Sequence, residues 1–352
     1  MIKDGIYFNM DEATYRADPA LSQSGIKTLL TDPEEFWYRS HMNPDRPAEE
    51  QKDSLDRGKM WHSRILERQT FDQKYQRAPW LDREFYAGRV ALNTVDDMKA
   101  WLTGAGVEFK KTGKKADFEA AIMAVPGWEK TAILIDSFTE RYINEARTTV
   151  IYSAEVWDDM LAAEAAIQSH PYFSKVFLGG FPEASIFWTD ETGLRLKARI
   201  DLLKPGQIID YKTLYVQRGK SVRKAGLDAI KWESYDLQAA MYTIAVGHAV
   251  RMIKDGTGVV EGDIAGGFID EFAKTPEKPF IFIFQNEARP NTVRGLCVKR
   301  RSNDSFNAFG NGLFLMQKGI DLFQEYHGKF GEKRWFDPTG ITEVMDNDIY
   351  YS

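Results

Sequence analysis

The sequence has little of what marks a secreted or membrane protein. It contains one cysteine, Cys297, so no disulfide framework can form within the chain. No stretch approaches the roughly 18 consecutive apolar residues that a membrane span needs. No basic start followed by an apolar segment indicates a signal peptide. These absences predict a cytoplasmic protein that makes no membrane contact.

Motifs for nucleotide hydrolysis and for covalent catalysis are also missing. The chain has no phosphate loop of the G-x-x-x-x-G-K-[ST] type and no G-x-S-x-G nucleophile motif. Cys297 has no histidine near it in the sequence, as a cysteine nucleophile would need. ATP-driven unwinding therefore has no support, and a covalent mechanism is disfavoured.

What the chain does have is size, apolar residues and a local excess of positive charge. Its 352 residues, 43% of them hydrophobic, predict one large domain with an insertion. The net charge of -6 argues mildly against non-specific coating of nucleic acid. Between Arg195 and Lys231, however, ten basic residues stand against three acidic ones. A solvated basic face is the alternative to a DNA contact. This alternative has less weight here, because the same stretch carries the acidic motif described below.

Three strands are predicted within and just before this basic stretch, over residues 183–188, 194–201 and 207–213. In the middle strand apolar and charged residues alternate strictly, so four charged side chains share one face. They are Arg195, Lys197, Arg199 and Asp201. In the third strand Asp210 and Lys212 are two residues apart and therefore share a face as well.

Helices are predicted on both sides of these strands. After a short aromatic strand near residue 6, Ser22 or Ser24 is expected to cap a helix that is interrupted at Pro33. Gln238 and Tyr242 are four residues apart and so lie on one face of a later helix. Further helices are predicted over 54–71, 135–169, 232–253 and 304–329, and a further core strand over 278–287.

Carboxylates at adjacent strand ends predict a metal site. Asp201 and Asp210 would form a hard, oxygen-rich site suited to Mg²⁺ or Mn²⁺, which can hold a phosphate oxygen and polarise a water. Lys212 can orient that water or stabilise the charge that builds on the phosphate. The spacing D-x8-D-x-K after a hairpin is that of the PD-(D/E)xK nuclease superfamily. Taken alone, the pattern fits a surface hairpin with an ion pair equally well.

Four further segments resemble nucleases of the exonuclease VIII (RecE) and RecB type. His62 lies in GKMWHSRILE, which is similar to their G-x-x-x-H-x-x-[IVL]-[LI]-E segment. Glu183 occupies their upstream acidic position, and Gln238 and Tyr242 match the Q-x-x-x-Y helix after the lysine strand. The N-terminal GIYF and LSQS segments resemble the start of the exonuclease VIII nuclease domain. The resemblance covers about residues 1–75 and 150–345.

The resemblance implies a fold and a set of site residues. The fold is α/β, with a PD-(D/E)xK restriction-endonuclease-like core in residues 1–87 and 128–352, in which a mixed central β-sheet is flanked by helices. The implied metal ligands are His62, Asp201 and Asp210, with Lys212 as the catalytic lysine and Glu183, Gln238 and Tyr242 as supporting residues. An ordinary strand-opening surface acid is the alternative for Glu183. Arg195, Lys197 and Arg199 share the face of Asp201 and are expected to hold the DNA strand.

The same resemblance implies an activity and partners. The activity is Mg²⁺-dependent (or Mn²⁺-dependent), processive 5' to 3' digestion of linear double-stranded DNA, which leaves 3' single strands for recombination of the phage or prophage type in the bacterial cytoplasm. The implied partners are DNA ends, a RecT-like single-strand annealing recombinase and further copies of the chain in a ring, commonly a tetramer. An endonuclease on the same core and a DNA-binding accessory protein with an inactive nuclease fold stay open as alternatives.

Residues 88–127 depart from the compact family pattern. Thr94 can cap a helix with Asp97 at the capping-box position, and a second helix is expected to begin within GKKADFEAAIM. This helix-extension-helix pattern is similar to SAP-like modules, which bind DNA. Phosphate contacts would then come from Lys110, Lys111, Lys114 and Lys115. The alternative is a protruding structural or oligomer-contact hairpin with a solvated lysine face.

Overall fold

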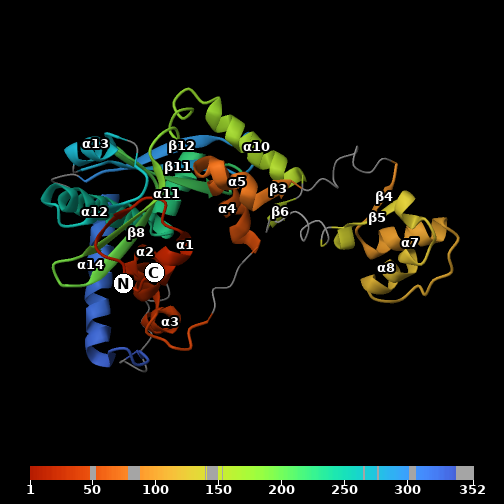
Figure 1. The fold of residues 1–352 in the computed structure, drawn as a ribbon, viewed down its shortest axis with the longest axis horizontal. Helices are drawn as coiled ribbons and strands as arrows, with labels where there is room; N and C mark the ends of the chain where they lie inside the picture. The colour runs from red at the N-terminus through yellow and green to blue at the C-terminus, as the bar shows by residue number, and fades with distance from the viewer. Residues whose placement is uncertain are drawn as a thin grey trace. The chain divides into compact units, whose positions relative to one another are not determined.

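The chain forms two compact units in a computed structural model (Figure 1). One unit combines Met1–His62 with Ala166–Ser352, and the other is Ser63–Ala165, which is wider than the insertion of 88–127 that the sequence suggests. The structure describes residues 1–47, 53–77, 88–138, 140, 150–152, 154–264, 266–275, 277–300 and 307–337. No helix in these ranges is both long enough and apolar enough to cross a membrane.

The first unit is built on a mixed eight-stranded β-sheet, as predicted. Its order is β10-β1-β7-β8-β9-β11-β12, and β2 pairs with β8. The three predicted strands form the central antiparallel meander, and β11 runs parallel to β9. The bounds are β1 Gly5–Tyr7, β2 Leu21–Ser22, β7 Phe181–Thr189, β8 Arg195–Lys204, β9 Gln207–Leu214, β10 Val259–Glu261, β11 Phe280–Asn286 and β12 Val293–Val298.

The sheet buries an apolar face against helices. In β8, Leu196, Ala198 and Ile200 are fully buried, which confirms the predicted alternation. Every second residue of β11 is a buried phenylalanine, and Phe282 and Phe284 stack on each other in the same core. The sequence of β11 contains the continuous apolar run FIFIF, which is typical of a strand buried on both faces.

The long helices α12 (Tyr235–Asp255) and α14 (Ala308–Phe330) pack together over this core. Their close approach requires glycine, because a Cβ atom at Gly312 would overlap the backbone carbonyl of Asp236. Ser22 caps α2 (Gln23–Thr31) by accepting a hydrogen bond from the Gly25 N–H at 3.2 Å, as predicted. Smaller helices of this unit are α1 Glu12–Ala17, α3 Pro33–Arg39, α11 Val222–Trp232 and α13 Phe268–Lys274.

The second unit has its own small core. The predicted helices are α7 (Val95–Gly104), with its Thr94–Asp97 capping box, and α8 (Lys115–Met123), which pack with a parallel strand pair that was not predicted. That pair is β4 Val90–Leu92 and β5 Ala132–Leu134. Other described elements of this unit include α5 Arg68–Lys74, β3 Tyr75–Arg77, η2 Trp128–Lys130 and β6 Val150–Tyr152.

Two predicted helices differ from the structure. The helix expected over 54–71 is α4 (Asp53–Leu66), which ends where Glu67 leaves helical geometry. The prediction of a single helix over 135–169 is wrong at Val150–Tyr152, which form strand β6 and pair with β3. The helix α10 (Ala154–Gln168) follows this strand. Residues 139, 141–149 and 153 of that prediction lie outside the described part of the chain.

Candidate active site

Asp201 and Asp210 stand opposite each other at the point where two strands separate. Asp201 lies inside β8 and not at its end, which corrects the prediction. The β8–β9 pairing stops at Leu202 and Ile209, so the two aspartates would form the next pair. The Tyr211 N–H donates to Asp201 Oδ2 at 3.2 Å. The sheet thus opens at this place, and a carboxylate satisfies the freed backbone donor.

A distortion in the neighbouring strand brings a third acid to the same place. In β7, Pro182 pairs with Leu202 and Ala184 with Ile200, so Glu183 stands opposite Asp201. Glu183 has a φ of 55°, which residues with side chains seldom adopt and which is often found where a strand re-aims a side chain at a functional site. Because like charges opposite each other repel, this arrangement needs a cation to stabilise it.

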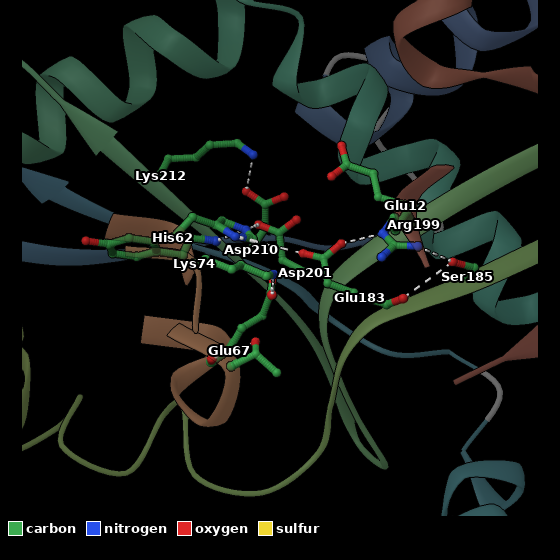
Figure 2. Close-up of polar contacts among 12 residues, drawn as sticks. Glu12, His62, Glu67, Lys74, Glu183, Ser185, Arg199, Asp201, Asp210 and Lys212 are labelled. Carbon is green, nitrogen blue, oxygen red and sulfur yellow. Dashed lines mark hydrogen bonds and ion pairs between the residues drawn. The ribbon is translucent and has the colours of Figure 1, made fainter. Parts of the chain in front are cut away.

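Helix α4 contributes a histidine to these acids (Figure 2). His62 Nε2 lies 3.0 Å from Asp201 Oδ2, and His62 Nδ1 lies 3.8 Å from Glu183 Oε1. One ligand atom from each of the three residues can be chosen so that all lie within 4.8 Å of one another. The histidine that the sequence motif singled out therefore meets the two acids from the strands.

Asp210 is buried between two partners. Lys212 Nζ lies 2.8 Å from Asp210 Oδ1 in an ion pair, and Gln238 Nε2 donates to Oδ2 at 2.6 Å (Figure 2 shows the ion pair). The residue is only 1% exposed, yet no group in the described part of the chain donates a well-directed hydrogen bond to Oδ1. Tyr242, one turn along α12, packs near Phe280 and does not bond to the acids in the described structure.

The charges at the site shift one another's pKa values. Burial raises the pKa of Asp210, and the neighbouring Asp201 raises it further. Burial acts in the same direction on Asp201, but Lys212 and His62 outweigh it and lower its pKa. The pKa of His62 is raised to about 9, since the attraction of Asp201 exceeds the effect of burial. The same two cations, Lys212 and His62, therefore favour the charged form of both Asp201 and Asp210, and the effect prevails over burial only at Asp201.

The donor set fits a divalent cation. Asp201, Asp210 and Glu183 supply hard carboxylate oxygens, and His62 supplies an imidazole nitrogen. The buried Asp210 Oδ1 lacks a directed donor, and a bound ion would satisfy it. The predicted ligands were His62, Asp201 and Asp210. Among the described residues, the possible ligand atoms that cluster come from His62, Asp201 and Glu183, which was expected only to support them, and Asp210 as a ligand stays a prediction.

Two of the three cations predicted to hold DNA, Arg195 and Lys197, make hydrogen bonds within the protein. Lys197 is 6% exposed, and its Nζ donates to the carbonyls of Asp18 at 2.6 Å and Tyr15 at 2.9 Å. Arg195 Nη1 donates to the Asp18 carboxylate at 3.3 Å, and Nη2 donates to the Ile2 carbonyl. These contacts fasten the N-terminal segment to β8. Both residues also line the cavity described below, and their contact with DNA stays a prediction.

Arg199 has a different position. Its Nε donates to Glu183 Oε2 at 2.5 Å, and its Nη1 donates to Ser185 Oγ at 3.1 Å (Figure 2). Together with Tyr242 and the first turn of α2, it lines a cavity of about 490 Å³. Arg199 thus orients one of the acids and presents positive charge to the cavity.

The four lysines of the predicted basic loop lie in the second unit. Lys110, Lys111 and Lys114 are exposed, whereas Lys115 Nζ pairs with Asp136 Oδ2 at 2.6 Å. Contact of these lysines with DNA stays a prediction.

Replacing His62 with alanine is expected to weaken Mn²⁺ binding by about tenfold or more, because the ion would lose a ligand while the acids remain. Isothermal titration calorimetry of the wild type and His62→Ala measures this change. His327→Ala is the matched control, since His327 is exposed on α14. Equal Mn²⁺ affinity of wild type and His62→Ala would contradict a role of His62 as ligand.

Known proteins resemble this chain to different degrees. No curated protein matches the sequence. One solved structure, described as a "putative exonuclease" from Eubacterium rectale, matches over 96% of this chain and 95% of its own, at 15% identity and a TM-score of 0.44. Residues 22–252, well over half of the chain, match the family described as "PDDEXK-like domain of unknown function (DUF3799)". This range contains all the acids, the histidine, the lysine and the glutamine of the site, and the chain belongs to this PDDEXK-like family.

Proposed function

We propose that the protein is a metal-dependent exodeoxyribonuclease that hydrolyses phosphodiester bonds of linear double-stranded DNA. One observation carries the proposal. The buried Asp210 is paired with Lys212 and stands opposite Asp201, and Asp201 lies 3.0 Å from His62. Family membership supports the nuclease chemistry. The preference for DNA ends, the 5' to 3' direction and a role in recombination rest on the resemblance to exonuclease VIII.

The residues of the chain divide the chemical work. Asp201, Asp210, Glu183 and His62 would hold Mg²⁺ or Mn²⁺, which when bound would polarise the scissile phosphate and lower the pKa of a water. Gln238 fixes the Asp210 carboxylate through Oδ2 and so leaves Oδ1 for other partners. Lys212 is kept charged, because Asp210 and Asp201 raise its pKa despite burial. Its ammonium can stabilise the negative charge that builds on the phosphate.

The cavity beside the site suits a nucleic-acid strand. Arg199 faces it, and Arg16, Arg39 and Arg195 also line it, with Glu12 as an acid among them. A concave surface lined by positive side chains attracts phosphates, and backbone contacts of this kind position DNA without reading its sequence. The cavity therefore supports a substrate that extends beyond the scissile phosphate.

The completeness of the site favours an enzyme over an inactive accessory protein. His62, Asp201, Asp210 and Lys212 come from three separate elements, yet the polar atoms of His62 and Asp201, and those of Asp210 and Lys212, meet. A DNA-binding module without activity would have no need of this arrangement. The annealing recombinase partner and the ring-like oligomer belong to the same proposal through the resemblance.

The test is digestion of linear and covalently closed duplex DNA that carries label at either the 5' or the 3' ends of the linear form. Early loss of the 5' label from linear DNA, in Mg²⁺ and not in EDTA, is the expected result. Cutting of closed circles would replace the exonuclease by an endonuclease on the same core. Absence of cleavage with every divalent metal, while DNA is still bound, would favour the accessory protein.

A further inference from the structure

Helix α11 presents an aromatic and basic surface directly after the strand that carries Lys212. Arg223, Leu227 and Lys231 are four residues apart and exposed, so they follow one face of the helix, and Trp232 ends it. We name these four residues the α11 outer face. Trp232 is 69% exposed, and Lys231 Nζ lies 4.2 Å from the centre of its ring.

The cations of this face have no acid to neutralise them. The one acid within α11, Asp228, forms ion pairs with Lys224 at 2.6 Å and with Lys220 at 3.7 Å. In the described part of the chain, neither Arg223 nor Lys231 makes an ion pair. An exposed indole beside the uncompensated Lys231, with the uncompensated Arg223 about two turns earlier on the helix, combines the two attractions that single-stranded nucleic acid offers, namely base stacking and phosphate charge.

The face is connected to the catalytic lysine through the junction of α11 and α12. Ser234 makes this corner with a φ of 56°, and Tyr235 follows it. Lys212 Nζ lies 5.3 Å from the centre of the Tyr235 ring, which stacks on Phe282 and Phe284. Trp232 is thus three residues from the side chain that touches Lys212.

Contacts on two sides hold the backbone of α11 and of its junction with α12. Lys27 Nζ donates to the Glu233 carbonyl at 2.9 Å, which fastens the junction to α2. On the inner side of α11, Gly226 lies so close to Phe284 that a Cβ atom would approach the ring within 2.7 Å. Because the backbone is held on both sides, Trp232 is exposed on a fixed scaffold and not on a free loop.

We infer that the α11 outer face is a stacking platform for unpaired deoxynucleotides next to the scissile phosphate. Bases stack on the Trp232 indole, and Arg223 and Lys231 contact the phosphates. From Arg223 to Lys231 the helix rises by roughly 12 Å, about the length of three stacked nucleotides at roughly 3.4 Å each. This inference rests on the proposed nuclease function and adds a preference for a frayed, single-stranded end at the site.

The test measures binding of a fluorescent oligodeoxythymidylate by anisotropy in EDTA, where the proposed nuclease is inactive. Trp232→Ala is expected to weaken binding by about tenfold, a loss typical of one stacked base, whereas Trp232→Phe keeps a stacking ring and stays within about threefold of wild type. Phe314→Ala is the matched control, because Phe314 is 64% exposed on α14, and it should bind like wild type.

The cations are tested through the salt dependence of the same binding. In Arg223→Ala/Lys231→Ala, the slope of log affinity against log salt should fall by about 1.4, since each phosphate contact on a single strand contributes about 0.7. Lys254→Ala, which removes an exposed lysine at the other end of α12, should keep the wild-type slope.

Unchanged affinity in Trp232→Ala would overturn the platform, and so would a Phe variant as weak as the Ala variant. A lower molar mass of Trp232→Ala in light scattering, with unchanged oligonucleotide binding, would assign the face to self-association instead. The outcome for the nuclease is read separately: a wild type that binds through Trp232 but cuts no DNA in Mg²⁺ would overturn the proposed activity and uphold the platform.

Discussion

Lys212→Ala is expected to reduce metal-dependent DNA cleavage by about 10³-fold, the loss typical when one group that stabilises transition-state charge is removed. The ammonium lies 2.8 Å from Asp210 Oδ1 and 5.3 Å from the centre of the Tyr235 ring, so it is held beside one of the acids of the site. Steady-state cleavage of end-labelled duplex DNA in Mg²⁺ measures the effect. Most of the loss should appear in kcat, since the charge that Lys212 stabilises develops in the transition state.

The matched control for this variant is Lys254→Ala, which removes an exposed lysine and should cleave like wild type. A second variant, Lys212→Arg, keeps the positive charge but replaces the compact ammonium by a planar group, so it should recover only part of the activity. Circular dichroism and oligonucleotide binding in EDTA verify that each variant is folded. Full activity in Lys212→Ala would remove the lysine from the mechanism and with it the main support for the proposed chemistry.

Gly312→Ala is expected to lower the free energy of unfolding by about 3 kcal/mol, at the upper end of the range for overpacked sites. The added methyl group would overlap the Asp236 carbonyl, and backbone atoms cannot rotate away as a side chain can. Asp236 also accepts a hydrogen bond from Asn311 Nδ2 at 2.5 Å, so the strain falls on a tight contact between α12 and α14. Urea denaturation followed by circular dichroism measures the loss.

Gly328→Ala is the control for Gly312→Ala, because it lies on the same helix and its Cβ would meet no atom within 4 Å. There the change should stabilise the protein by about 0.5–1 kcal/mol, since alanine favours a helix more than glycine does. Gln238 is two residues from Asp236, so Gly312→Ala should reduce cleavage as well. A Gly312→Ala protein as stable as wild type would show that the helices are not in close contact.

The sequence predicted the parts of the site that are encoded locally. Alternation in residues 194–201 and the turn at Lys-Pro-Gly determine the β8–β9 meander, and the two-residue spacing of Asp210 and Lys212 predicts their shared face, which the 2.8 Å ion pair confirms. Ser22 and the Thr94 capping box are likewise local signals, and both helices begin where these residues predict.

What the sequence did not predict depends on contacts between distant segments. Nothing near Lys197 in the sequence indicates that its ammonium donates to the carbonyls of Tyr15 and Asp18, more than 170 positions earlier. The left-handed φ of Glu183 has no sequence signal, because only the surrounding sheet can impose it on a residue with a side chain. The β4–β5 pair was missed for a similar reason: its two short strands are separated by two helices.

The strand order has a consequence for the synthesis of the protein. β9, which carries Asp210 and Lys212, has β11 as its neighbour on the side away from β8, and β11 is residues Phe280–Asn286. Every residue of the proposed metal site precedes position 243, so a nascent chain exposes the whole reactive set before β11 leaves the ribosome. Until then β9 is an unpaired edge, and the aromatic side of the core is missing. The strand that carries Asp210 and Lys212 is therefore supported on both sides only after β11 has been synthesised.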